Sequence, residues 1–63
     1  MTLFEAQAAA PILTHVFGDA EVRQYGSEPY DYFVRVYDRL CTIDIDSADA
    51  AGRLIAGKIK GSR

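Results

Sequence analysis

The chain of 63 residues is 49% hydrophobic and 25% charged, and this composition excludes an intrinsically disordered tail. A single cysteine, Cys41, excludes an internal disulfide and favours a reducing compartment, the cytoplasm. No apolar run approaches the roughly 20 residues of a membrane span, so residues 1–63 are predicted to form one globular domain without a membrane anchor. Because a domain this short buries only about 60% of the surface of its unfolded chain, we expect its stability to be marginal.

Charge is distributed unevenly along the chain. All nine acidic residues lie in residues 1–49 together with three arginines, whereas residues 50–63 hold four basic residues and no acid. The net charge of −2 therefore combines an acidic body with a basic end. Such an asymmetry is consistent with an ordinary solvated surface or with a charged partner.

A first helix is predicted between Thr2 and Gly18. Thr2 and Glu5 have the spacing of a capping box, and Gly18 supplies a stop. Pro11 predicts a kink or a break near Ala10, because proline lacks a backbone donor and clashes one turn back. Two apolar stripes follow the helix, one of Leu3, Ala6, Ala10, Leu13 and Phe17 and the other of Phe4, Ala8, Ile12 and Val16. One stripe can cover a small sheet, and the other is then exposed unless a further surface covers it.

Three strands are predicted over residues 20–25, 30–37 and 40–46. Residues 26–29 (GSEP) have turn chemistry, and Asp38 and Arg39 are expected to form a tight reversal. The short connections indicate an antiparallel meander. By the two-residue alternation of a strand, the residues predicted to face the helices are Val22, Tyr32, Val34, Val36, Cys41, Ile43 and Ile45.

A second helix is predicted to begin at Asp46 or Ser47, either of which can cap it, and to end at Gly61. Gly52 weakens this helix by about 1 kcal/mol relative to alanine, although it would allow a close approach to the sheet. The predicted buried face consists of Ala48, Ala51, Leu54, Ile55 and Ile59. The predicted fold class is therefore α+β, a three-stranded antiparallel meander with two helices on one face in the order α-β-β-β-α.

Residues suited to catalysis or to metal binding are scarce, so no enzyme, no metal site and no cofactor is predicted. His15 is the only histidine and is expected on the helix surface, while Cys41 is expected in the core. The run DIDSAD lacks the sixth-position glycine and the distal glutamate of a calcium loop, and helix capping explains Ser47 and Asp49. No glycine-rich phosphate loop follows a strand and opens a helix.

The uncovered face of the sheet is the candidate functional surface. Tyrosine and arginine anchor many interfaces because each combines apolar area with polar reach. The alternative is a solvent-exposed face whose cross-strand aromatic pairs stabilise the sheet. The residues predicted on this face are Glu21, Arg23, Tyr25, Asp31, Phe33, Arg35, Tyr37, Thr42 and Asp44.

Two kinds of partner are compatible with a functional open face. A nucleic acid could stack its bases on Tyr25, Phe33 and Tyr37 while Arg23 and Arg35 hold phosphates. The acidic residues of the same face would repel a polyanion, which favours a protein partner. The second apolar stripe of the first helix adds surface for that partner or for a homodimer.

The predicted element order resembles the double-stranded-RNA-binding domain over the whole chain. The second helix opens with DSADAAG where that family has a lysine-rich run, so this resemblance implies topology alone. The segment YFVRVYDRLCTIDIDSADAAGRLIA resembles the sheet-then-helix unit of arm-binding integrase N-termini, in which Arg23, Arg35 and Arg39 would serve. The stretches LFEAQAAAPILTHVFGDAEVRQYG and VRVYDR are similar to phage head-tail joining proteins.

A further resemblance is to small phage-encoded inhibitors of host defence, anti-CRISPR proteins among them. It is carried by the small acidic domain, the short meander, the S-x-x-x-A helix start from Ser47 to Ala51 and the lack of a catalytic set. This resemblance implies a mobile-element origin and a binding role.

The sequence thus predicts a non-catalytic binding protein, a phage or mobile-element inhibitor that blocks a host nucleic-acid-handling complex of the CRISPR type. Its acidic residues would contact a positively charged surface on a protein partner that normally binds nucleic acid. The alternatives are a small nucleic-acid-binding module and a phage head-tail structural protein. The residues predicted to contact the partner are Tyr25, Asp31, Phe33, Arg35, Tyr37, Asp44, Asp46 and Asp49.

Overall fold

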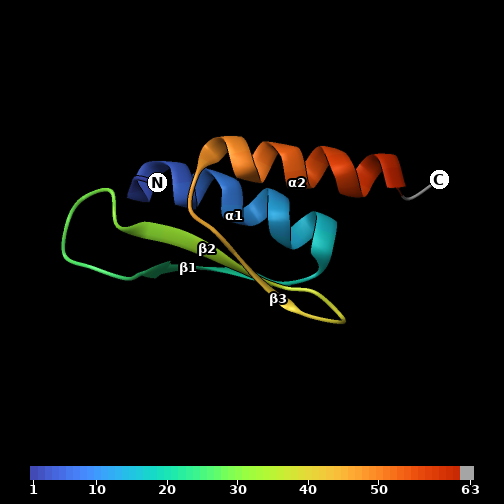
Figure 1. Ribbon diagram of the computed structural model, residues 1–63, viewed down its shortest axis with the longest axis horizontal. Helices are drawn as coiled ribbons and strands as arrows, with labels where there is room; N and C mark the ends of the chain where they lie inside the picture. The colour runs from blue at the N-terminus through green and yellow to red at the C-terminus, as the bar shows by residue number, and fades with distance from the viewer. Residues whose placement is uncertain (62–63) are drawn as a thin grey trace.

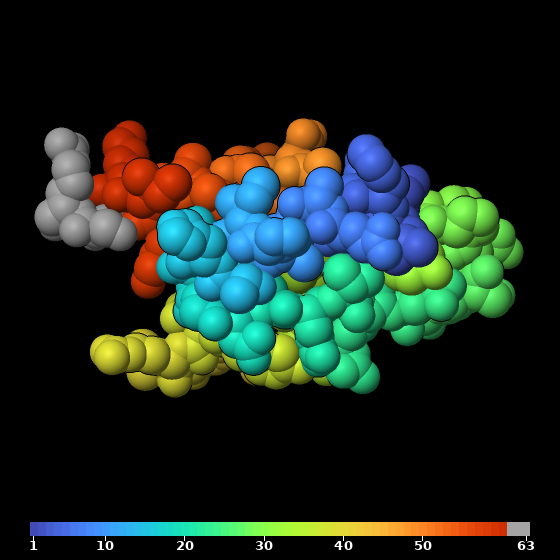
Figure 2. Space-filling view, turned by 180° about the vertical axis from the view of Figure 1, so that it is seen from behind, coloured from blue at the N-terminus to red at the C-terminus, as the bar shows by residue number. Residues whose placement is uncertain are grey.

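Two helices cover one face of a three-stranded sheet in the computed structural model, which describes residues 1–61 (Figure 1). The elements are α1 (Leu3–Phe17), β1 (Ala20–Gln24), β2 (Tyr32–Tyr37), β3 (Thr42–Ile45) and α2 (Ala48–Gly61). The predicted α+β fold and its α-β-β-β-α order are therefore confirmed. Seen from the opposite side, α1 lies across the sheet and α2 packs alongside α1 (Figure 2). Arg63, part of the predicted basic end, lies outside the described residues.

Helix α1 begins as its sequence predicts but is not interrupted. The Thr2 hydroxyl accepts a hydrogen bond from the Glu5 backbone (3.1 Å), and the Glu5 carboxylate accepts one from the Thr2 backbone (2.9 Å), which completes the capping box. The predicted break near Ala10 is wrong, since α1 continues through Pro11. Pro11 and Gln7, the residue one turn back whose carbonyl loses its helical partner, are both exposed, so the proline lies on the solvent side of the helix. Gly18 ends the helix with a φ of 106°, a conformation that favours glycine.

The strands form an antiparallel meander in the order β1-β2-β3. Val34 pairs with Val22 on one side and with Ile45 on the other, so these three side chains form a row across the inner face of the sheet. Val34 and Val36 are both fully buried beneath the helices. The strand phase predicted from the sequence is therefore confirmed, and the odd-numbered residues of β2 lie on the open face.

The hydrophobic core lies between the inner face of the sheet and the two helices. Full burial of one leucine or valine side chain stabilises a fold by about 1.5–3 kcal/mol, so the few fully buried residues carry much of the stability. Among the described residues, no polar or charged side chain is buried. The core consists of Met1, Ala6, Leu13, Val34, Val36, Ile45 and Ala51.

The connection between β2 and β3 is longer than predicted. Tyr37 pairs with Thr42, and the Asp38 backbone donates a hydrogen bond to the Cys41 carbonyl (2.9 Å), which closes a four-residue loop. Strand β3 therefore begins at Thr42, two residues later than expected. Cys41 is exposed in this loop, so its predicted place in the core is wrong, and its neighbour Leu40 is 95% exposed.

Helix α2 is capped by Ser47, whose hydroxyl accepts a hydrogen bond from the Ala50 backbone (3.1 Å). Ala51 is buried against the core, but Ile59 is 62% exposed, so its predicted burial is wrong. The cause is geometric, because the last turns of α2 extend beyond the end of α1 (Figure 1). Gly52 is also exposed, with no atom within 4 Å of the position of a Cβ, so the predicted close approach to the sheet is wrong.

The α-amino group of Met1 connects the start of the central strand β2 to the segment between β3 and α2. It donates hydrogen bonds to the carbonyls of Tyr30 (3.2 Å), Tyr32 (3.0 Å) and Asp46 (2.7 Å). The Tyr32 backbone donates in return to the Met1 carbonyl (3.1 Å). These contacts fix Asp46, the residue between β3 and α2, relative to the second strand.

Candidate functional site

A row of three charged residues crosses the open face of the sheet. Arg35 of β2 lies between Glu21 of β1 and Asp44 of β3 in the strand register. Its Nε donates to Asp44 Oδ1 (2.9 Å) and its second guanidinium nitrogen donates to Asp44 Oδ2 (3.3 Å), so the pair is held by two hydrogen bonds. The hydrogen bonds from Arg35 lower the pKa of Asp44, and the same bonds raise the pKa of Arg35.

Glu21 joins two further residues of the open face. Its carboxylate accepts hydrogen bonds from the Tyr37 hydroxyl and from the guanidinium group of Arg23 (2.9 Å). The bond from Tyr37, followed by that from Arg23, lowers the pKa of Glu21. The bond to Glu21 in turn raises the pKa of Tyr37, because ionisation of the phenol would destroy it. Both arginines of the open face therefore have carboxylate partners on that face.

Phe33 is buried although it lies on the open face. The rings of Tyr25 and Phe33 are 5.8 Å apart between centroids, and the guanidinium carbon of Arg35 is 5.5 Å from the Phe33 centroid. Phe33 is only 9% exposed as a result. The expectation that its ring is left in water is wrong, because Tyr25 and Arg35 both pack on that ring.

A shallow hollow of about 360 Å³ lies over this part of the face. It is lined by two aromatic residues, Tyr25 and Phe33, by the Arg35–Asp44 pair and by Asp46. Asp46 is exposed, and no side-chain partner of its carboxylate is found among residues 1–61. The hollow thus combines aromatic surface with one carboxylate that has no partner in the described part of the chain.

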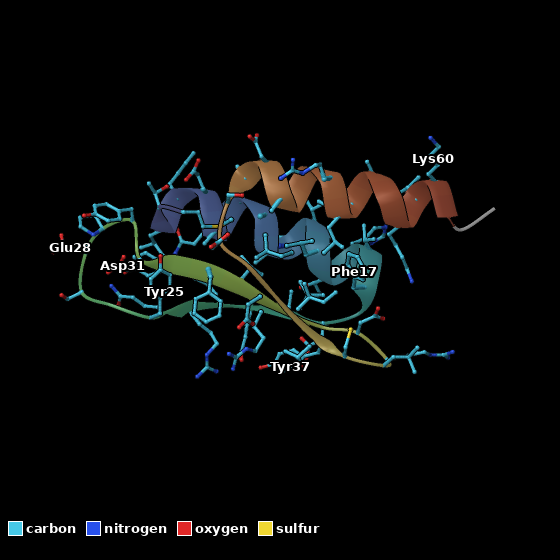
Figure 3. All side chains as sticks on the ribbon, viewed as in Figure 1. Phe17, Tyr25, Glu28, Asp31, Tyr37 and Lys60 are labelled. Atoms are coloured by element: carbon cyan, nitrogen blue, oxygen red, sulfur yellow. The ribbon has the colours of Figure 1, made fainter. Side chains whose placement is uncertain are left out.

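The structure brings five of the eight predicted contact residues together in this hollow, namely Tyr25, Phe33, Arg35, Asp44 and Asp46. Tyr37 lies on the same face outside the hollow, on the side of the sheet away from the helices (Figure 3).

Asp31 and Asp49 lie elsewhere. The Asp31 carboxylate accepts a hydrogen bond from the Glu28 backbone (3.2 Å), and the two residues lie together in the loop between β1 and β2 (Figure 3). Asp31 therefore shapes that loop. Asp49 is exposed in the first turn of α2, on the helical layer. The open face and Asp49 belong to different sides of the molecule.

The sequence-based selection of contact residues omitted Glu21 and Arg23, which organise one side of the open face. Glu21 lies directly across from Arg35 in the β1–β2 register. Strand alternation placed Glu21 on this face, but its two hydrogen bonds depend on the register. The signal that could have identified Glu21 and Arg23 is the antiparallel register of β1 and β2. Once that register is drawn, the charged residues of β1 lie opposite the outward-facing residues of β2.

Groups with reactive side chains do not converge in the described residues. His15 is exposed in the last turn of α1, as predicted, and Cys41 is exposed in the loop between β2 and β3. No group of three or more His, Cys, Asp or Glu residues within positions 1–61 has the geometry of a metal site. Neither helix in this part of the chain is long and apolar enough to cross a membrane.

Comparisons with known proteins give no relative. No protein-family model, no curated protein and no solved structure matches this chain. The resemblances noted in the sequence therefore stay predictions.

Proposed function

We propose that this chain is a non-catalytic binding protein that recognises a protein partner through the open face of its sheet. The observation that carries the proposal is the pairing of both face arginines. Arg35 binds Asp44 and Arg23 binds Glu21, while Asp46 borders an aromatic hollow. The face therefore offers aromatic area and negative charge, and its positive charge is already neutralised.

This arrangement favours a basic protein segment over a nucleic acid. Binding of a polyanion draws its affinity from cationic groups that contact phosphates. On the open face, each guanidinium group would have to leave a carboxylate before it could contact a phosphate. The remaining basic side chains of the described residues lie on α2 or in the loop between β2 and β3 and do not line the hollow, and the Met1 ammonium group is engaged by three backbone carbonyls.

The chemistry of the hollow specifies the partner side chain. A lysine or arginine over an aromatic ring gains cation–π energy of about 0.5–2 kcal/mol, depending on how far it is desolvated. Tyr25, which is 62% exposed, supplies the accessible ring, and Asp46, which also lines the hollow, supplies a counter-charge. A basic side chain that enters the hollow would therefore have both an aromatic ring and a carboxylate to contact.

The test uses a short arginine-containing peptide and follows backbone amide shifts by NMR. Tyr25→Ala and Asp46→Asn should each weaken binding by about tenfold, which corresponds to 1.4 kcal/mol. Asp49→Asn is the matched control, because it makes the same chemical change on the helical layer and should leave the affinity unchanged. Equal effects of Asp46→Asn and Asp49→Asn would contradict the proposed face.

A gel-shift assay with duplex and single-stranded nucleic acids tests the alternative. Binding at low salt that is lost in Arg23→Gln and Arg35→Gln would favour a nucleic-acid module and contradict a protein-binding face.

The finer proposal is that the partner is a subunit of a host nucleic-acid-handling complex and that the chain acts as a phage-derived inhibitor. The acidic body of the chain supports this proposal, because a subunit that binds nucleic acid has a positively charged surface. Expression of the chain in cells that clear a plasmid by CRISPR interference should preserve the plasmid, and Asp46→Asn should reduce this protection. Undiminished clearance would contradict this role.

A further inference from the structure

Strand β1 is an edge strand, and its outer edge is unpaired within residues 1–61. It pairs with β2 alone, and it lies on the near side of the molecule in Figure 2, where no other element crosses it. An uncovered edge strand presents backbone donors and acceptors with which another strand can pair. The backbone groups of β1 that point away from β2 therefore decide what can pair with this edge.

The hydrogen bonds just beyond the two ends of β1 identify these groups. The Tyr37 backbone donates to the Asp19 carbonyl (3.1 Å), and the Tyr25 backbone donates to the Asp31 carbonyl (3.0 Å). Every second residue of an antiparallel strand bonds to the same neighbour, so the odd-numbered residues of β1 direct their backbone groups toward β2. The even-numbered residues direct theirs outward, and within residues 1–61 no hydrogen bond from another element reaches them. These residues are Ala20, Val22 and Gln24.

The side chains of this edge are complementary in charge to a second copy of themselves. Glu21 and Arg23 lie on the open face, one on each side of Val22. When two copies of β1 pair antiparallel with Val22 opposite Val22, Glu21 of each copy lies opposite Arg23 of the other. The outward backbone groups of the two Val22 residues then face each other, and those of Ala20 face those of Gln24, so hydrogen bonds can form at each pair. Opposite charges directly across an antiparallel pair stabilise it.

Charge also selects this register over its neighbours. A slip of one residue would leave outward backbone groups opposite groups that already bond to β2. A slip of two residues would place either Glu21 opposite Glu21 or Arg23 opposite Arg23, and like charges directly across destabilise a pair. In the register centred on Val22, the remaining charged residue, Asp19, lies opposite the neutral Tyr25. No like charges therefore oppose each other across residues 19–25.

The ion pair within β1 is compatible with this arrangement. Arg23 donates to Glu21 of its own strand (2.9 Å), and Glu21 also accepts from Tyr37 of β2. The second copy brings another Arg23 toward Glu21 from across the edge. The glutamates and arginines of the two copies then form a ring in which the sign of the charge alternates.

The helical layer leaves room for a second copy. Helix α1 packs over β1 and β2, whereas α2 packs against α1 and β3, so the flank of α1 away from α2 lies above the free edge. With Leu13 turned to the sheet and Ile12 toward α2, a rotation of 100° per residue places no charged residue on that flank. Because paired strands are about 4.8 Å apart, two copies of α1 would lie about 10 Å apart, near the spacing of packed helices. The flank consists of Leu3, Gln7, Ala10 and Thr14.

We propose that two copies of this chain pair through β1, antiparallel and centred on Val22, to form one continuous sheet. The twofold axis is perpendicular to the sheet, so α1 lies beside α1 and both helical layers lie on one side. Both open faces therefore point the same way. If these faces bind protein as proposed above, the dimer presents two hollows on one surface and can bind two basic segments at once. This consequence rests on the proposed function, whereas the dimer itself does not.

Sedimentation equilibrium over a concentration series tests the dimer without any partner. The mass should rise with concentration from 7.0 kDa toward twice that value. Gln24→Pro should raise the dissociation constant at least tenfold, because it removes an outward donor and leaves the ladder between β1 and β2 intact. Circular dichroism should show unchanged secondary structure. Gln24→Ala is the matched control, because it changes the same exposed side chain but keeps the backbone donor, and its dissociation constant should not change.

Charge reversal tests the register. Arg23→Glu and Glu21→Arg should each weaken the dimer several-fold, because like charges then face each other across the edge. An equimolar mixture of the two variants should dimerise as the wild type does, since residues 21 and 23 then carry opposite charges at every opposed pair. Circular dichroism of each variant checks that its monomer is folded.

Three results would overturn the proposal. A chain that is monomeric at every concentration excludes the dimer, and binding of an extended peptide to such a chain would assign the β1 edge to a strand of another protein. A dimer insensitive to Gln24→Pro has its interface elsewhere. A mixture of the charge-reversed chains that dimerises no better than either variant alone contradicts the register centred on Val22.

Discussion

The two faces of the sheet are built from the same three strands but differ in burial and in charge. On the inner face, Val34 and Val36 are fully buried and Ile45 is 3% exposed, and within residues 1–61 no polar or charged side chain is buried with them. On the outer face, the residues one position along the chain, Arg35 and Asp44, form a solvent-accessible ion pair. The two-residue alternation thus places buried and solvent-accessible side chains on opposite faces of the same strands. Substitutions on the inner side are therefore expected to change the free energy of unfolding more than substitutions on the outer side, the face that we propose to bind a partner.

Leu13→Ala is expected to have the largest effect, because Leu13 packs from α1 onto the inner face and is fully buried. Truncation of a buried leucine leaves a cavity and costs about 3 kcal/mol of unfolding free energy. For a domain of this size, such a loss is a large part of the total stability. Chemical denaturation monitored by circular dichroism measures it.

Leu40→Ala is the matched control. It removes the same atoms from a side chain that is 95% exposed, so the free energy of unfolding should change by less than about 0.5 kcal/mol. Similar losses for the two variants would show that burial beneath the helices does not set the stability of this sheet.

Phe33→Ala is expected to have the second largest effect on the free energy of unfolding. It shows that the outer face also contributes to stability. Phe33 lies on the outer face but is 9% exposed under Tyr25 and Arg35, so its removal should cost about 2 kcal/mol of unfolding free energy. Tyr37→Ala, at a side chain that is 38% exposed on the same face, should cost less. Equal denaturation midpoints for Phe33→Ala and the wild type would show that the outer face contributes no stability.

Much of the fold follows from local signals. The Thr2–Glu5 capping box, the Ser47 cap and the alternation of β2 each specify their element without information from distant residues. The β2–β3 loop could not be predicted in this way. Its length depends on the pairing of Tyr37 with Thr42, which moves Cys41 out of the strand. The exposure of Ile59 similarly depends on where α1 ends beneath α2.

The sequence predicts which residues lie on the open face, but it does not predict the contacts between their side chains. Alternation correctly assigned Tyr25, Phe33 and Arg35 to the open face, and these residues line one hollow. The burial of Phe33 arises from ring and guanidinium stacking, which depends on rotamers and register. Alternation also assigns Asp31 to the open face, and charge favours Asp49 as a contact residue, but the structure places Asp31 in a loop and Asp49 on the helical layer.

Gly57→Ala should raise the free energy of unfolding, by less than the two preceding variants lower it. Residue 57 lies on α2 and belongs to neither face of the sheet. Gly57 is exposed within α2, and a Cβ there would meet no atom within 4 Å. Alanine is favoured over glycine in a helix interior by about 1 kcal/mol, so the variant should be stabilised by about that amount. Thermal denaturation measures the gain. A lower melting temperature would show that α2 requires the backbone freedom of glycine at this position.

The ion pair of the outer face should give the smallest effect, and this effect should depend on pH. Arg35 lowers the pKa of Asp44 in the folded state, so the pair contributes stability above the ordinary carboxyl pKa and loses it as the pH falls through the lowered value. Asp44→Asn removes this contribution. The difference in unfolding free energy between wild type and Asp44→Asn should therefore be present at neutral pH and shrink below about pH 4.

Asp46→Asn is the matched control for this titration, because the Asp46 side chain has no ion-pair partner in the described part of the chain. Since both carboxylates are exposed at the outer face, the comparison isolates the contribution of Arg35 from the general effect of a lost negative charge. Denaturation curves between neutral and acid pH should show a pH-dependent difference for Asp44→Asn that exceeds the one for Asp46→Asn. If the two variants behaved alike, Arg35 would serve only to cover Phe33, and the pair with Asp44 would contribute nothing measurable to folding.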